Sequence, residues 1–321
     1  MPIRSGRPSD GGTSRRLTPV PVRQARLTAE RSGRRLGGGP IINRWALLAV
    51  PAIVFLIAFF LAPLVAVSLR SVTEFPKPTT DIFANYERFA ASASNVRVLA
   101  NTFWVAVLST VVCLALGYPY AYLMNIVRPR IAGLLLIAVL LPFWSSLLVR
   151  TYAWQVILRD TGIINTFLLD MHWVEEPLPL IRTTLGVMLG MSQILLPFMV
   201  LPLYASMRRI DPELTKAAAN LGARPFTAFR RVFLPLSMPG VLAGSLLVFV
   251  LALGFYITPA LLGSPKDTMI SQFIASAVQQ RLDWGIASTM GVILLALALI
   301  VLFVASRFVR LRDVYGSLEE S

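Results

Sequence analysis

The chain of 321 residues is poor in charged residues, cysteine and histidine. Only 14% of its residues are charged and 56% are hydrophobic, which is too apolar for an ordinary soluble domain. The single cysteine, Cys113, excludes a disulfide framework, and the single histidine, His172, has no Cys or His neighbour to complete a metal site. We therefore expect no metal in this chain and interpret His172 as a solvated loop residue.

Long apolar runs are what the chain has in place of charge. Each is long enough to cross a bilayer as a helix, which takes about 20 residues. Six such runs argue against buried core helices, and their continuity argues against a β-barrel. We expect an all-α polytopic membrane protein with six transmembrane helices, at Trp45–Leu69, Val98–Val127, Ile131–Val149, Thr183–Met207, Val232–Pro265 and Trp284–Ser306. The third run either ends at Val149 or continues past Arg150 to Leu158, and the ends of the over-long fifth run must be loop or interface.

Two further absences concern the source of energy. None of the three lysines, Lys77, Lys216 and Lys266, follows a glycine, so the P-loop pattern that binds ATP is missing. All sixteen Asp and Glu residues lie in the expected loops and tails, although ion-coupled transporters usually carry acidic residues within the membrane. We therefore expect no cofactor in this chain and infer that energy arrives from a separate subunit through a cytoplasmic contact. An ion-coupled secondary transporter is the alternative. No cluster of nucleophile and base supports a membrane enzyme.

The basic residues indicate the orientation in the membrane. With the N-terminus inside, the inner segments hold 21 Lys and Arg residues and the outer segments hold nine. The positive-inside rule therefore places both termini in the cytoplasm. Residues 1–44 read as a basic disordered tail, residues 45–310 as the membrane domain, and residues 311–321 as a C-terminal tail. The N-terminal tail either enforces orientation alone or contacts anionic lipid. The net charge of +14 does not indicate nucleic-acid binding, because the sequence contains no recognisable nucleic-acid-binding module.

The cytoplasmic segment 208–240 carries signals for two short helices. Asp211 and Pro212 suit the start of a helix of about nine residues, and Gly222 suits its left-handed end. Pro225 begins a second helix, and the Leu234-Pro235 step is expected to break it before the next membrane span. Two short helices that meet at a glycine predict a compact projection with small residues at its tip.

The segment Lys216 to Gly240, KAAANLGARPFTAFRRVFLPLSMPG, resembles the EAA loop of permeases in ATP-binding-cassette (ABC) importers. Lys216 stands where that family usually has Glu, and Glu213 lies about one turn earlier on a similar face. The resemblance implies a coupling loop that transmits ATP hydrolysis to a pore. The residues assigned to the ATPase contact are Glu213, Lys216, Ala217, Ala218, Leu221, Gly222 and Ala223.

Other stretches resemble the spermidine/putrescine branch of these permeases, and together they cover about residues 45–310. They include Asn101-Thr102-Phe103, the run Leu141 to Trp154, the run Leu196 to Tyr204, and GFYITPALLG from Gly254 to Gly263. The resemblance implies a type I ABC-importer fold in a bacterial inner membrane. It also implies three partners: a second six-span permease, an ABC ATPase dimer that binds ATP and Mg, and an extracytoplasmic solute-binding protein.

The cargo is less clearly marked than the class. The resemblance implies a polyamine-like cargo. Several related sequences have an acid where this chain has Phe255, and that departure leaves another organic cation or an amino-acid-like compound as alternatives. Aromatic residues near the mid-span breaks expected at Pro142, Pro197 and Pro259 are the candidates for the pathway lining, although packing or an interfacial belt is the alternative. They are Trp144, Tyr152, Phe198, Phe255 and Tyr256. Arg150, a lone charge beside them, either extends to the outer surface or binds an anionic group.

Overall fold

The computed structural model describes residues 44–73, 81 and 83–318, which form helices and connecting turns without a strand. The chain divides into two units, residues 1–59 and 60–321. In the first unit, α2 (Arg44–Leu56) leads into the π-helix η1 (Ile57–Leu61), and the rings of Phe55 and Phe59 stack 4.7 Å apart. Most of the expected N-terminal tail, residues 1–43, lies outside the described residues.

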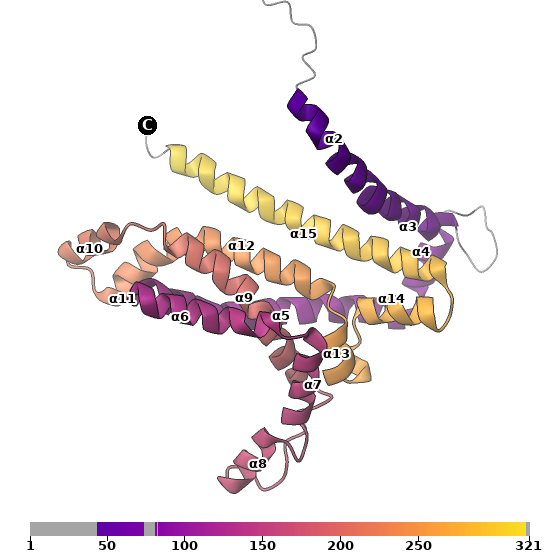
Figure 1. Cartoon of the computed structure of the whole chain (residues 1–321), viewed down its shortest axis with the longest axis horizontal. Coiled ribbons are helices and arrows are strands. Elements are labelled where there is room, and N and C mark those ends of the chain that lie inside the picture. The colour runs from indigo at the N-terminus through magenta and orange to yellow at the C-terminus, as the bar shows by residue number, and fades with distance from the viewer. Residues whose placement is uncertain (1–43, 74–80, 82, 319–321) are drawn as a thin grey trace, which may run out of the picture. The chain divides into compact units, whose positions relative to one another are not determined.

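Three long helices form the core of the second unit: α5 (Ala93–Ile126), α9 (Thr184–Met207) and α12 (Leu234–Leu253) (Figure 1). Glycines let them approach closely around Met199 of α9. A Cβ atom on Gly117 would lie 2.9 Å from Met199 Cγ, and one on Gly244 would lie 2.9 Å from Met199 Sδ. Both distances are shorter than real Cβ contacts, so Met199 fills the space that two missing side chains leave between α5 and α12.

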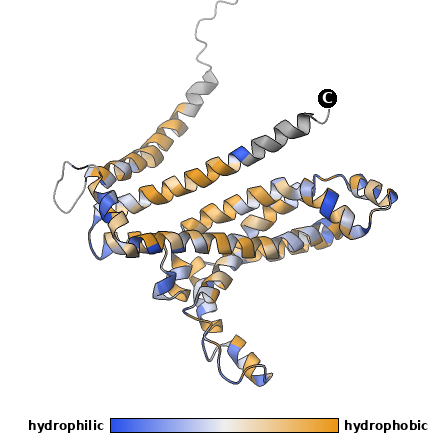
Figure 2. Cartoon of the chain, turned by 180° about the vertical axis from the view of Figure 1, so that it is seen from behind, coloured by the Kyte–Doolittle hydropathy of each residue, from blue (hydrophilic) through white to orange (hydrophobic). Residues whose placement is uncertain are grey.

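The described helices fit the expected six membrane spans. Five are long and apolar enough to cross a membrane, and one bent pair makes a sixth if it counts as a single span. Figure 2 shows hydrophobic residues along α5, α9, α12 and α15 and hydrophilic residues gathered near helix ends. The five straight spans are Val50–Thr73, Ala93–Ile126, Thr184–Met207, Pro225–Leu253 and Trp284–Arg307.

The third span is broken after Pro142, which confirms the break expected there. Helix α6 (Pro129–Leu140) tightens into the 3-10 helix η2 (Leu141–Trp144), and α7 (Leu147–Ile157) follows at an angle of 97° to this segment. Pro142 cannot donate a helical hydrogen bond, and the next two serines have extended backbone ψ angles of 149° and 140°. The breaks expected at Pro197 and Pro259 are wrong, because Pro197 lies within the unbroken α9 and Pro259 lies within the short helix α13 (Ile257–Leu262).

The fifth span is also shorter than its apolar run. Helix α12 ends at Leu253, and the separate short helix α13 (Ile257–Leu262) follows after a turn. At its start, the expected break at Leu234-Pro235 is wrong, because α11 (Pro225–Ala228) continues through the π-helix η3 (Phe229–Phe233) into α12. The wider turn, in which the Leu234 N–H donates to the Phe229 carbonyl, accommodates a proline that would clash in a regular α-helix.

A second cluster of packed side chains joins α4 (Ala84–Ala91), the start of α5, α14 (Ile270–Gln279) and α15 (Trp284–Leu318). Helix α3 (Ala62–Thr73) packs beside this cluster, along α15. Polar contacts fix it around Ser71, whose carbonyl accepts from Asn85 Nδ2 at 3.0 Å and from Thr289 Oγ1 at 3.4 Å. Helix α15 continues to Leu318, beyond its candidate membrane span, which ends at Arg307.

Candidate functional site

The segment 208–240, here called the coupling loop, folds locally as its sequence indicates. Asp211 Oδ1 accepts a hydrogen bond from the Glu213 N–H at 2.9 Å, and Pro212 occupies the first turn. Helix α10 (Pro212–Asn220) has nine residues, so the expected length is confirmed. The cap satisfies a backbone N–H that would otherwise lack a partner at the start of a helix.

Gly222 ends α10 in the left-handed conformation, with φ of +83°. The Ala223 N–H donates to the Ala218 carbonyl at 3.1 Å and the Gly222 N–H donates to the Ala219 carbonyl at 2.9 Å, which together make a Schellman motif. A Cβ atom on Gly222 would meet nothing within 4 Å. The requirement for glycine here is therefore set by backbone conformation and not by lack of space.

Lys216 and Glu213 form an ion pair on the exposed face of α10. Lys216 Nζ donates to Glu213 Oε1 at 2.8 Å, across three residues of the helix. The hydrogen bond and charge of Glu213 raise the pKa of Lys216 above its usual value. Lys216, at the position where an acid was expected, is therefore already paired within the loop.

Residues 216–226, here called the loop tip, expose large apolar side chains beside small ones. Leu221 is 89% exposed and Phe226 is 72% exposed, while Ala217 is exposed and Ala218 and Ala223 are half-buried. Exposed apolar side chains of this size next to alanines allow another surface to approach closely. The tip has the composition of a docking surface.

Aromatic contacts fix the coupling loop to the core helices. The ring of Tyr122 on α5 lies 5.4 Å from Phe229 and 5.1 Å from Phe233, edge to face in both cases. The Tyr118 hydroxyl also lies 2.9 Å from Ser237 Oγ at the start of α12. A displacement of the loop tip would therefore be transmitted to α5 and α12 through packed side chains.

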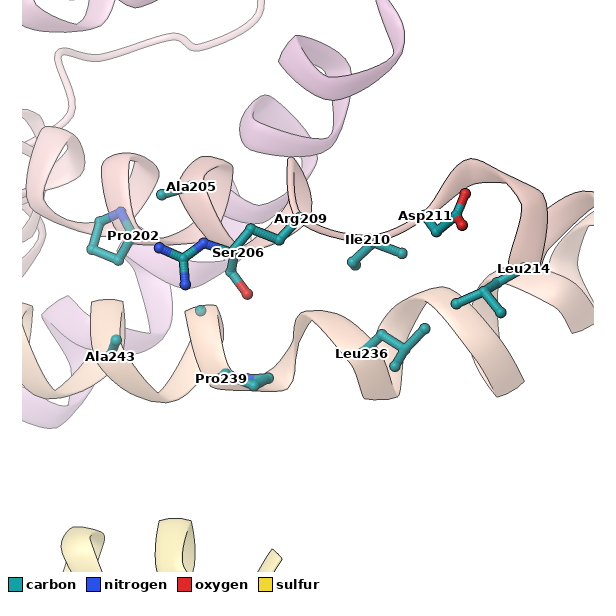
Figure 3. Close-up of a pocket in the computed structure, with 11 residues that line it drawn as sticks. Pro202, Ala205, Ser206, Arg209, Ile210, Asp211, Leu214, Leu236, Pro239 and Ala243 are labelled. Carbon is teal, nitrogen blue, oxygen red and sulfur yellow. The ribbon is translucent and has the colours of Figure 1, made fainter. Parts of the chain in front are cut away.

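A groove of about 570 Å³ separates the end of α9 from the start of α12 beside the loop. Figure 3 shows Pro202 and Ser206 of α9 on one wall and Leu236 and Pro239 of α12 on the other. Arg209 also lines it. At its floor the helices nearly touch, because a Cβ atom on Gly240 would lie 2.6 Å from Ser206 Cβ.

The broken spans meet at the end of the second unit away from the coupling loop (Figure 1). Helix α7 packs on α13, and the buried hydroxyls of Thr151 and Thr258 lie 3.4 Å apart. Trp154 Nε1 donates to Gln193 Oε1 of α9 at 2.6 Å. Both short helices are thereby held against α9.

The five candidate pathway aromatics occupy these broken segments and the adjoining part of α9. Trp144 is 81% exposed on η2 and Tyr152 is 54% exposed on α7. Phe198 is half-buried and packs edge to face on Phe143, with centroids 5.6 Å apart. Phe255 is half-buried after α12, and Tyr256 lines a polar groove of about 430 Å³ together with Gln272 and Arg281.

Asp267 links the start of α9 to the turn after α13, a role that was not expected from the sequence. It belongs to the 3-10 helix η4 (Pro265–Asp267), and it is buried. Its carboxylate accepts hydrogen bonds from Thr184 Oγ1 at 2.6 Å and from the N–H and hydroxyl of Ser264 at 2.9 and 2.6 Å. Burial alone would raise the pKa of Asp267, but these hydrogen bonds hold it below its usual value. The Ser-Pro-Lys-Asp capping pattern was the available signal.

Asn101 and Thr102, which carried part of the family resemblance, have a structural task. Asn101 Nδ2 donates to the Thr268 carbonyl at 3.0 Å, and the Ile270 N–H donates to Thr102 Oγ1 at 2.8 Å. They attach the turn before α14 to α5. His172 is exposed in a turn with φ of 56°, and no group of three metal-ligating side chains occurs in the described part of the chain.

Comparison with known proteins identifies the class. Residues 40–312 match the model of the family described as binding-protein-dependent transport system inner membrane component. The chain belongs to this family. It is therefore an inner-membrane permease subunit of an ABC importer, a translocation component whose ATPase is a separate subunit. The resemblance stated from the sequence is confirmed.

Individual relatives agree with this membership. The spermidine/putrescine transport system permease protein PotB of Haemophilus influenzae is 38% identical over 211 residues, covering 66% of this chain and 74% of that protein. The molybdenum transport system permease protein ModB of Mycobacterium bovis is 30% identical over 268 residues, covering 83% of this chain and 95% of that protein. One chain in the crystal structure of a bacterial alginate ABC transporter superposes on this chain with a TM-score of 0.68 at 20% identity. The match covers 84% of this chain and 96% of that chain, which shows a shared fold.

Proposed function

We propose that this permease subunit moves a polyamine or a related organic cation from a solute-binding protein into the bacterial cytoplasm. The relatives of Haemophilus influenzae and Escherichia coli named as spermidine/putrescine permeases, at 38% and 36% identity, support this cargo class. Aromatic side chains at the broken spans, Trp144, Tyr152, Phe198, Phe255 and Tyr256, supply cation–π faces in place of intramembrane carboxylates. Amino-acid-like compounds are the competing cargo.

The proposed pathway runs between this subunit and a second six-span permease. Helices α7 and α13 are short and packed on α9, so their ends leave backbone groups that a water-filled cavity or a neighbouring subunit can satisfy. The solute-binding protein would deliver the cargo at this end. Both termini and the coupling loop would lie in the cytoplasm, with basic loops near the lipid headgroups.

The observation that carries the proposed mechanism is the exposed tip of a rigidly mounted loop. Leu221 and Phe226 project from a tip whose base is packed on Tyr122 by Phe229 and Phe233. An ABC ATPase dimer that grips this tip would move α5 and α12 when ATP binding closes it. ATP hydrolysis would then reset the pathway.

The charge on the loop indicates what the ATPase surface should contain. Segment 208–231 holds six basic residues against Asp211 and Glu213, and Arg224, Arg230 and Arg231 are exposed together with Lys216. An apolar pocket for Leu221 and Phe226 with carboxylates at its rim would complement this surface. Because Lys216 is already paired with Glu213, we expect an ion contact between residue 216 and the ATPase to contribute less than the apolar anchor formed by Leu221 and Phe226.

Reconstitution of the complete importer in vesicles tests the proposal. Uptake of radiolabelled spermidine should require the ATPase, ATP, the binding protein and this permease together. Uptake driven by a proton or sodium gradient without the ATPase would contradict it and favour the ion-coupled alternative. A parallel measurement with acidic and neutral amino acids distinguishes the cargo classes, because only cationic amines should stimulate ATP hydrolysis.

A further inference from the structure

The last turns of α5 contact both the coupling loop and α6. The Tyr122 ring lies edge to face 5.4 Å from Phe229 and 5.1 Å from Phe233 of η3. The Tyr120 hydroxyl donates a hydrogen bond to the Leu135 carbonyl of α6 at 2.7 Å. Because residues two positions apart on an α-helix project about 200° apart, the two tyrosines contact the loop and α6 from opposite sides of one helix end.

Pro119 lies inside α5, directly before these turns. It has no N–H, so the Ala115 carbonyl lacks its regular helical donor, and helix bends concentrate at such positions. On the other side of Pro119, Gly117 is packed against α9, where a Cβ atom would lie 2.9 Å from Met199 Cγ. The body of α5 is therefore fixed to the core up to Pro119, and the proline gives the helix a place to bend beyond that point.

Helix α6 leads from this contact to the break in the third span. It packs on α5 and α9 and continues into η2, after which α7 follows at 97°. Figure 1 shows α6 running from the coupling-loop end of the second unit toward α7. The Leu135 carbonyl lies in the middle of α6, and a hydrogen bond fixes direction as well as distance. A movement of Tyr120 would therefore act on the broken span through one short helix.

We propose that the end of α5 after Pro119 transmits a displacement of the coupling loop to the broken third span. Tyr122 receives the displacement from η3, and Tyr120 passes it to α6. This inference rests on the proposed function, because that function provides the ATPase that moves the loop. Tyr120 is then a positioning residue that acts on α7 through α6. A chain of contacts carries coupling only if removal of one link uncouples its two ends, which defines the test.

Electron paramagnetic resonance in the assembled importer tests this junction. In a Cys113→Ala background, a spin label is placed at Leu148 of α7 or at Leu247 of α12, both of which are exposed. Addition of a nonhydrolysable ATP analogue should change both spectra. Tyr120→Phe should reduce the change at residue 148 at least about twofold, since one hydrogen bond is lost. It should leave the change at residue 247 intact, because α12 continues directly from η3.

Two results would overturn the inference. An unchanged response at residue 148 in Tyr120→Phe would assign the transmission to α9, on which α6 and α7 also pack. A parent importer that responds at residue 247 and not at residue 148 would show that the loop does not act on α7. The measurement needs the ATPase and nucleotide but no cargo, so ATP-driven spermidine uptake tests the proposed function separately.

The stoichiometry of transport gives a second test. Tyr120→Phe should lower the uptake of solute per ATP hydrolysed by about two- to tenfold, the range that loss of one hydrogen bond allows, with retention of the ATPase unchanged. Tyr204→Phe is the matched control, because Tyr204 is half-buried on α9 and its hydroxyl makes no hydrogen bond in the described part of the chain. The phenylalanine there keeps the ring under Arg208. Equal uptake per ATP in the two variants would overturn the role of Tyr120.

Discussion

Lys216 donates a hydrogen bond to Glu213 across one turn of α10, with 2.8 Å between Nζ and Oε1. Lys216 stands where the resemblance to the EAA loop led us to expect Glu. The positive charge is matched within the loop, so an ATPase that docks here meets a neutral pair beside the exposed Leu221. Docking would then depend mainly on shape and apolar contact.

Exchange of the two charges tests this relationship. The double variant Glu213→Lys/Lys216→Glu keeps an ion pair three residues apart, while Lys216→Met removes it. Both should leave the thermal midpoint of the permease unchanged, because the two side chains are exposed. Co-purification of the ATPase should survive both changes. Loss of the ATPase in the exchanged variant alone would show that the partner reads the charge at residue 216.

Removal of the apolar anchor should have the larger effect. Leu221→Ala should weaken retention of the ATPase by about tenfold or more if Leu221 is the apolar anchor, since truncation of a hot-spot side chain costs about 2 kcal/mol or more. Leu214→Ala, a less exposed leucine on the same helix at 47%, is the control. Size-exclusion chromatography and binding kinetics of the purified subunits would measure the difference, and equal retention for both variants would refute the anchor.

Gly222 should be sensitive to side chains that resist the left-handed conformation. Gly222→Val forces a β-branched residue to φ near +83°, which costs roughly 1–3 kcal/mol and distorts the end of α10. We expect normal membrane insertion with ATP hydrolysis uncoupled from uptake. Gly222→Asn should retain most uptake, because asparagine tolerates this region. Normal solute uptake by the valine variant would contradict this account of the loop.

The contact between Gly244 and Met199 predicts a packing defect. A Cβ atom at residue 244 would lie 2.9 Å from Met199 Sδ and 3.1 Å from the Met199 carbonyl oxygen, so Gly244→Ala should destabilise the fold by roughly 1–3 kcal/mol. Gly133→Ala on α6 is the matched control, because a Cβ atom there meets nothing within 4 Å. Thermal unfolding in detergent should show a lower midpoint for the first variant only.

Asp267 predicts a dependence of stability on pH. Its folded pKa is below the unfolded value of about 3.9, so the ionised carboxylate contributes stability above about pH 4 that is lost as pH falls through the folded value. Asp267→Ala should lower stability by roughly 1–3 kcal/mol at neutral pH, since Thr184 and Ser264 lose their acceptor. The variant should also show a smaller decrease of the unfolding midpoint as the pH is lowered below about 4. Asp170→Ala, at an exposed residue, should change neither quantity.

Local signals predicted the coupling loop well. The Asp211 cap, the nine-residue helix and the left-handed Gly222 all follow from interactions within a few residues, and the structure confirms each. The break expected at Leu234-Pro235 is absent, because contacts with a distant helix also act on this step. A π-turn absorbs the missing N–H of Pro235, and the packing of Phe229 and Phe233 on Tyr122 holds that turn in place.

The sequence by itself determined the class of this protein, because apolar run length, charge placement and loop motifs depend on bilayer thickness and local backbone chemistry. It also indicated the break at Pro142 in the third span, but it did not reveal that α9 runs unbroken through Pro197 or that Asp267 accepts hydrogen bonds from Thr184. Both depend on which groups meet across distant segments of the chain. In an apolar run every position looks alike, and only tertiary packing decides which side chains find partners.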